Sequence, residues 1–68
     1  MICTKKHFEE YKDVFEKDAV QVFNSLEEAS EEFSKRVEVS KETAKERIEN
    51  NTNADWIVSP DNKVYVMN

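Results

Sequence analysis

Residues 56–66, Trp-Ile-Val-Ser-Pro-Asp-Asn-Lys-Val-Tyr-Val, decide how this chain of 68 residues folds. Two short apolar runs rich in β-branched and aromatic residues flank a polar segment, Ser59–Asn62. Proline at the second position of a turn, followed by aspartate and by an asparagine that tolerates positive φ, is typical of a tight turn. The stretch therefore predicts a β-hairpin over 56–66.

The predicted hairpin also predicts a register. If Val58 pairs with Lys63 across the turn, Trp56 lies opposite Tyr65, and the two aromatic rings share one face of the hairpin. Such a pair is typical of a protein core or a dimer seam. If that face is exposed instead, Trp56 and Tyr65 are candidates for an interaction hot spot.

The segments before the hairpin predict three helices and one strand. Apolar residues recur at three- and four-residue steps over 4–17, which predicts an amphipathic helix, and the β-branched run 19–23 predicts a strand. Ser25 opens a capping box for a helix over 25–37, and Ser40 is the predicted N-cap of a helix over 40–50. The predicted fold is a single α+β domain, 1–68, with the helix, strand, helix, helix, hairpin order of a small winged helix-turn-helix.

We expect the first helix to pack against the following helix pair and the hairpin. The apolar stripes of the predicted elements supply the core. Its expected members are Phe8, Phe15, Val22, Leu26, Ala29, Phe33, Ala44, Ile48, Ile57 and Val64.

Composition excludes several classes of protein. The chain has one cysteine, Cys3, and one histidine, His7, too few for a disulfide framework or a typical zinc site, and it has no glycine for a phosphate-binding loop. We therefore expect no catalytic residues, no metal, no cofactor and no small-molecule ligand. Apolar runs are too short for a membrane span or a signal peptide, which indicates a cytoplasmic protein. Because so short a chain has a small core, a homodimer is a further expectation.

The helix pair resembles the helix-turn-helix of small phage and mobile-element proteins. The similarity lies in Ser-Leu-Glu-Glu-Ala-Ser-Glu-Glu-Phe at 25–33 and Val-Ser-Lys-Glu-Thr-Ala at 39–44, and it continues into Asn-Ala-Asp-Trp-Ile-Val at 53–58. Over about residues 22–66 the pattern is similar to excisionases and to the DNA-binding repeats of homing endonucleases. The resemblance implies a winged helix-turn-helix that binds DNA. The connection between the helices, Ser34–Glu38, is longer than the family's turn and lacks its glycine.

Charge indicates a different partner. The formal net charge is −5, and the helix over 40–50 presents Glu42, Glu46 and Glu49 opposite its predicted buried side. The preceding helix carries a second group of carboxylates. This group consists of Glu27, Glu28, Glu31 and Glu32. An acidic surface repels the phosphates of duplex DNA and is complementary to a basic, nucleic-acid-binding face of another protein.

Two functions follow as hypotheses. In the first, the chain is a non-enzymatic accessory protein of phage or mobile-element type whose acidic face binds a host or defence protein, in the style of a DNA-mimic inhibitor. In the second, it is a DNA-binding regulator or a recombination directionality factor. The residues expected to contact DNA in that case are Lys41, Lys45, Arg47, Asn62 and Lys63. A purely structural or dimerisation module is a third possibility.

Overall fold

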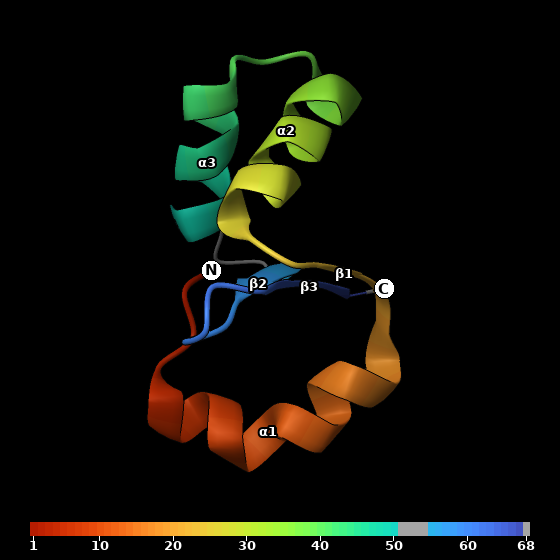
Figure 1. Ribbon diagram of the computed structural model, residues 1–68, viewed down its shortest axis with the longest axis vertical. Helices are drawn as coiled ribbons and strands as arrows, with labels where there is room; N and C mark the ends of the chain where they lie inside the picture. The colour runs from red at the N-terminus through yellow and green to blue at the C-terminus, as the bar shows by residue number, and fades with distance from the viewer. Residues whose placement is uncertain (51–54, 68) are drawn as a thin grey trace.

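The computed structural model describes residues 1–50 and 55–67, and within them it contains three helices and three strands (Figure 1). Their order is helix, strand, helix, helix and a C-terminal hairpin, which confirms the predicted α+β class. The elements are α1 (Lys5–Asp18), β1 (Ala19–Phe23), α2 (Leu26–Val37), α3 (Lys41–Asn50), β2 (Trp56–Val58) and β3 (Val64–Met67). None of the described helices is long and apolar enough to span a bilayer.

All three helices begin at a hydroxyl N-cap. The side chains of Thr4, Ser25 and Ser40 each accept a hydrogen bond from the backbone N–H three residues later, at 3.1–3.2 Å. These bonds satisfy N–H groups that have no partner inside the helix. The caps fix where α1, α2 and α3 start, and they agree with the N-caps that the sequence predicts.

The turn between α2 and α3 is shorter than expected. Helix α2 continues to Val37, so only residues 38–40 separate it from α3. Glu38 adopts a left-handed conformation, with φ 54° and ψ 50°, and its N–H donates to the carbonyl of Ser34. Glutamate therefore occupies the position that glycine fills in most such helix ends. The predicted helix end at residue 37 is confirmed, and the expectation of a long connection over 34–38 was wrong because residues 34–37 belong to the helix and Glu38 is its cap.

The sheet is antiparallel and has the strand order β1-β3-β2. Strand β3, the last in sequence, lies in the centre. The outer edge of β2 is covered by the N-terminal segment: the N–H of Cys3 donates to Val58 O at 2.9 Å, and the N–H of Val58 donates to Met1 O at 2.8 Å. Strand β1 forms the other edge.

The predicted hairpin register was wrong by one residue. Trp56 lies opposite Val66, not Tyr65, which lies opposite Ile57. The cause is the turn, in which Asn62 has φ 69° and its N–H donates to Ser59 O at 3.0 Å. A left-handed residue at this point closes a three-residue loop, which pairs Ser59 with Lys63 rather than Val58 with Lys63.

Because side chains alternate along a strand, the one-residue slip moves the two aromatic residues to opposite faces. Trp56 faces the helix pair, in a cluster of buried residues with Ala29, Ile48, Val58, Val64 and Val66. Tyr65 faces α1 and is buried with Cys3, Phe15 and Ile57.

The molecule has three layers, with the sheet between α1 on one side and the α2–α3 pair on the other (Figure 1). The expectation that the first helix packs against the helix pair was therefore wrong. Its buried residue, Phe15, lies against Tyr65 at 6.4 Å between ring centroids. Hydrophobic periodicity identifies the buried stripe of a helix and does not identify the surface that covers it.

Most of the expected core is buried, with one error. Val22 is 46% exposed on the edge strand. Six expected members are buried: Phe15, Ala29, Ala44, Ile48, Ile57 and Val64. Phe8, Leu26 and Phe33 are half-buried at the margins of the two clusters.

Candidate interaction surface

The outer face of α3 presents carboxylates to solvent. Ala44 and Ile48 are fully buried on one side of the helix. Glu42 and Glu46 therefore point outward, and both are exposed. Glu49, predicted with them, is half-buried instead. Burial lowers the pKa of the Met1 amino group. The negative charge of Glu49 acts in the opposite direction, because it favours the charged form of the amino group. The exposed acidic face of α3 is thus formed by Glu42 and Glu46.

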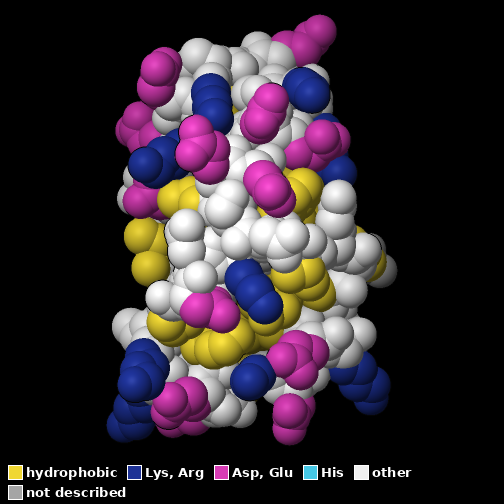
Figure 2. All heavy atoms as spheres, viewed as in Figure 1, with side chains coloured by type: hydrophobic (Ala, Val, Ile, Leu, Met, Phe, Trp, Pro, Cys, Tyr) yellow, Lys and Arg dark blue, Asp and Glu magenta, His cyan; other side chains and the backbone are white. Residues whose placement is uncertain are grey.

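Helix α2 contributes a second set of carboxylates beside the first. Glu27, Glu28 and Glu31 are exposed, and Glu32 is half-buried. Figure 2 shows Asp and Glu side chains spread over the part of the molecule that α2 and α3 form, with Lys and Arg side chains among them. Sequence reasoning predicted these residues as an acidic surface, and the α2–α3 packing brings the two sets to one end of the molecule.

Two basic residues of the helix pair are held by carboxylates, and one of them, Lys41, was expected to contact DNA. Lys41 Nζ lies 2.9 Å from Glu27 Oε1, and Arg36 Nε lies 3.2 Å from Glu32 Oε1. The hydrogen bond with Lys41 lowers the pKa of Glu27, and the same bond raises the pKa of Lys41. The i,i+4 spacing of Glu32 and Arg36 is visible in the sequence, whereas Glu27 and Lys41 are brought together only by the packing of α2 on α3.

Arg36 is also tied to the sheet. Its guanidinium carbon lies 5.5 Å from the centroid of the Trp56 ring, and its Nη2 donates to Gln21 Oε1 at 2.8 Å. A guanidinium that stacks on an aromatic ring and donates to two side chains is fixed in position. Sequence analysis did not single out this residue as functional, and its contacts give it a structural role between α2 and β1.

A shallow groove of about 370 Å³ runs between α2, α3 and the hairpin turn. It brings together three residues expected to contact DNA: Lys41, Lys45 and Asn62. The other two, Arg47 and Lys63, are exposed outside it. The groove is lined by Leu26, Glu27, Ser30, Lys41, Glu42, Lys45 and Asn62. Its two ammonium groups are matched by two carboxylates, so the groove has no excess of positive charge.

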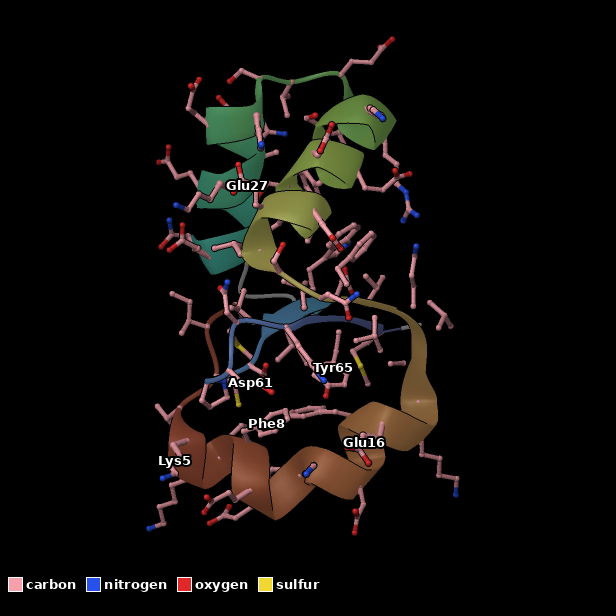
Figure 3. The ribbon with its side chains drawn as sticks, viewed as in Figure 1. Lys5, Phe8, Glu16, Glu27, Asp61 and Tyr65 are labelled. Atoms are coloured by element: carbon pink, nitrogen blue, oxygen red, sulfur yellow. The ribbon has the colours of Figure 1, made fainter. Side chains whose placement is uncertain are left out.

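The hairpin turn beside the groove is held by a small hydrogen-bond network. Ser59 Oγ accepts from the N–H of Lys63 at 3.1 Å and bonds to the Asp61 carboxylate. The bond from Ser59 lowers the pKa of Asp61. Figure 3 places Asp61 at the turn, between the helix pair and α1. This network fixes the loop that carries Asn62 and Lys63.

Trp56 and Tyr65 are both buried and therefore do not form an exposed hot spot. Trp56 stacks on Phe23 with ring centroids 5.5 Å apart, and Phe33 meets it edge-on at 5.2 Å. Tyr65 packs against Phe8 at 5.7 Å (Figure 3), and burial raises the pKa of its hydroxyl. The two residues are the central aromatic groups of the two core clusters.

The single cysteine lies in the core. Cys3 precedes α1, is buried beneath it, and burial raises the pKa of its thiol. A raised pKa lowers the fraction of reactive thiolate. In residues 1–50 and 55–67, no three His, Cys, Asp or Glu side chains are grouped to hold a metal ion.

No protein-family model matches the chain, and neither a curated protein nor a solved structure matches it. The α2–α3 surface is thus the feature from which a function can be argued.

Proposed function

We propose that this chain is a small acidic accessory protein, of phage or mobile-element type and without enzymatic activity, that binds a basic face of a host or defence protein. One observation carries the proposal: the outward face of α3 presents Glu42 and Glu46, while Lys41 at its first turn is paired with Glu27. In the proteins that the helix pair resembles, this face meets phosphate. In this chain the same face presents negative charge, as a phosphate group does.

The arrangement of charge supports a protein partner. Five exposed carboxylates lie on two adjacent helices whose relative position is fixed by a buried core and by the Lys41–Glu27 ion pair. They are Glu27, Glu28, Glu31, Glu42 and Glu46. Fixed rows of negative charge attract and orient a basic surface, and they speed its association at low salt. A partner that binds nucleic acid offers such a surface.

The test removes the two exposed carboxylates of α3, and a control variant loses the same amount of charge elsewhere. The variant Glu42→Gln with Glu46→Gln loses two negative charges from α3. Its matched control, Glu9→Gln with Glu10→Gln, loses two exposed charges from α1, on the other side of the sheet. Tagged wild type and both variants are used to capture proteins from a bacterial lysate, and captured proteins are challenged with duplex DNA.

We expect the wild type and the α1 control to retain a nucleic-acid-binding protein that duplex DNA displaces, and the α3 variant to lose it. Because the contact is electrostatic, raising the salt concentration weakens the capture. Equal loss in both variants contradicts a role for the α3 face, since it shows that net charge alone controls the binding.

A second candidate function is DNA binding, favoured by the three-residue turn between α2 and α3 and by the groove that joins Lys45 to Asn62. In this case Lys45 and Arg47 contact the major groove and Asn62 and Lys63 the minor groove. We expect Lys45→Gln with Arg47→Gln to abolish retardation of duplex DNA and Glu42→Gln with Glu46→Gln to strengthen it. A wild type that binds no duplex at about 50 mM salt contradicts this candidate.

A further inference from the structure

The outer edge of β1 is exposed and uncharged. Strand β1 pairs with β3 on one side, and on its other side it has no partner among residues 1–50 and 55–67. Val20 and Val22 are 64% and 46% exposed there. The run Ala19–Leu26 is the longest stretch without a charged residue in a chain in which 37% of residues are charged. The residues of this edge are therefore uncharged.

The two outer edges of the sheet differ in what covers them. At β2, the backbone of Met1–Cys3 occupies the outer hydrogen-bonding positions of Val58. At β1, the register shifts between Ala19 and Gln21, at the start of the strand. From Gln21 to Phe23 the strand pairs regularly with β3 and contains no charged residue or proline. An exposed apolar edge of this kind is a template for another strand.

We propose that β1 pairs antiparallel with β1 of a second copy of this chain, about a twofold axis at Gln21. The result is a continuous six-stranded sheet. The axis places Val20 opposite Val22 of the second copy and Val22 opposite Val20 of the second copy, so both exposed valines are covered at once. The paired strands, Ala19–Phe23 of each copy, contain no charged residue, so no like charges lie opposite each other along the pair.

The strand itself argues for a second copy as the occupant. The segment Val20-Gln21-Val22 reads the same in both directions, so an antiparallel second copy centred on Gln21 places a valine opposite each valine. The side chain of Gln21 is held on the helix-pair side of the sheet by Arg36, away from the new backbone contacts. A small domain also gains more from added burial than a large one does.

Electrostatics distinguishes this contact from the proposed acidic interface. Two copies of net charge −5 repel each other, and the strand edge itself is neutral. Added salt screens the repulsion and strengthens the dimer. The same salt weakens a contact between the carboxylates of α2 and α3 and a basic partner, so the two proposals succeed or fail independently.

The experiment measures mass against concentration by sedimentation equilibrium at low and high salt. The variant Val20→Lys with Val22→Lys places ammonium groups opposite each other at the edge. The control, Val14→Lys with Val37→Lys, adds the same charge at two valines that are 47% and 42% exposed on α1 and α2. All four positions are exposed, so the variants keep the fold, which circular dichroism verifies.

We expect a wild-type dimer that tightens with salt, an edge variant whose dissociation constant rises at least about tenfold, and a control that still dimerises. A wild type that is monomeric at its highest soluble concentration in high salt overturns the proposal, as does equal weakening in the edge variant and the control.

Oxidative cross-linking tests the register. A cysteine at the twofold axis, Gln21→Cys, faces its own copy and forms an intermolecular disulfide. Val37→Cys, away from the axis, does not, and Cys3 is buried in both. Cross-linking of Val37→Cys without cross-linking of Gln21→Cys overturns the β1 pairing.

Discussion

The helix pair and α1 cover opposite faces of one sheet, and they cover them unequally. On the helix-pair side, Ala29, Ala44 and Ile48 are fully buried, and Ala29 and Ile48 belong to one cluster with buried residues of the sheet. On the α1 side, only Phe15 of the helix is buried, and Phe8 is half-buried. Figure 2 shows hydrophobic side chains reaching the surface in the region between α1 and the helix pair.

The difference in burial between the two faces indicates which layer of the molecule is more rigid. The candidate interaction surface belongs to the helix-pair layer, which is the more densely buried one. In this layer, Trp56 is in contact with Phe23, Phe33 and Arg36. Helix α1 is attached through an aromatic cluster of Phe8, Phe15 and Tyr65. Regions with fewer buried contacts open more readily, so we expect α1 to be the first helix to unfold locally.

The largest expected effect is the loss of folding stability in Trp56→Ala, because Trp56 packs at the centre of the helix-pair layer. Truncating a buried tryptophan costs about 3–5 kcal/mol, which is most of the stability of a small domain. We expect the variant to be largely unfolded at 25 °C, as measured by circular dichroism and urea titration. A folded Trp56→Ala protein with a cooperative urea transition near that of the wild type contradicts the central position of Trp56.

A smaller effect is expected from Phe8→Ala in the α1 layer. Because Phe8 is half-buried, its truncation costs about 1–2 kcal/mol. Hydrogen exchange read residue by residue should show faster exchange of the α1 amides and little change in α2 and α3. Equal acceleration in all three helices means that the two layers unfold as one unit.

Stabilisation is expected from Glu38→Asn at the α2–α3 turn. A non-glycine residue in the left-handed region costs about 1–2 kcal/mol, and asparagine reduces this cost through local hydrogen bonding. We expect stability to rise by about 0.5–1 kcal/mol, a shift in thermal midpoint of about 2–8 °C. Glu31→Asn, a change in the helical part of α2, is the control and should lower the midpoint slightly.

The smallest effect concerns the pH dependence of the hairpin turn. The folded state lowers the pKa of Asp61 below its ordinary 3.8, so the stability this carboxylate contributes is present above that pH and is lost as the pH falls through the lower, folded value. Because the group is exposed, the effect is small. Urea titrations of wild type and Asp61→Asn should differ at neutral pH and converge in acid. A constant difference at both pH values excludes the Ser59–Asp61 bond as its source.

The sequence was informative where structure is local. Hydroxyl caps at Thr4, Ser25 and Ser40 and the apolar spacing of each helix predicted the element order and their bounds to within a residue or two. Two turns were misjudged: the length of the α2–α3 connection, which contains Glu38, and the length of the hairpin loop, which ends at Asn62, although the tolerance of Asn62 for positive φ was anticipated. Each turn contains a left-handed residue, and the one at Asn62 shifted the hairpin register and with it the faces of Trp56 and Tyr65.

Long-range packing could not be read from the sequence. The amphipathic pattern of α1 is equally compatible with either face of the sheet, so its position opposite the helix pair was not predictable. The acidic residues of α2 and α3 were predicted as exposed, and most of them are. Their pairing with Lys41 and Arg36 depends partly on contacts between residues far apart in the chain, as for Glu27 and Lys41.

The central position of β3 also determines when the protein can fold during synthesis. Both β1 and β2 hydrogen-bond to Val64–Met67, and β3 is made after the other helices and strands that the structure describes. A nascent chain that has emerged from the ribosome only as far as α3 carries helices without a sheet to bury them. The sheet, and with it the burial of α1 on one face and of the helix pair on the other, therefore forms only after β3 has been made.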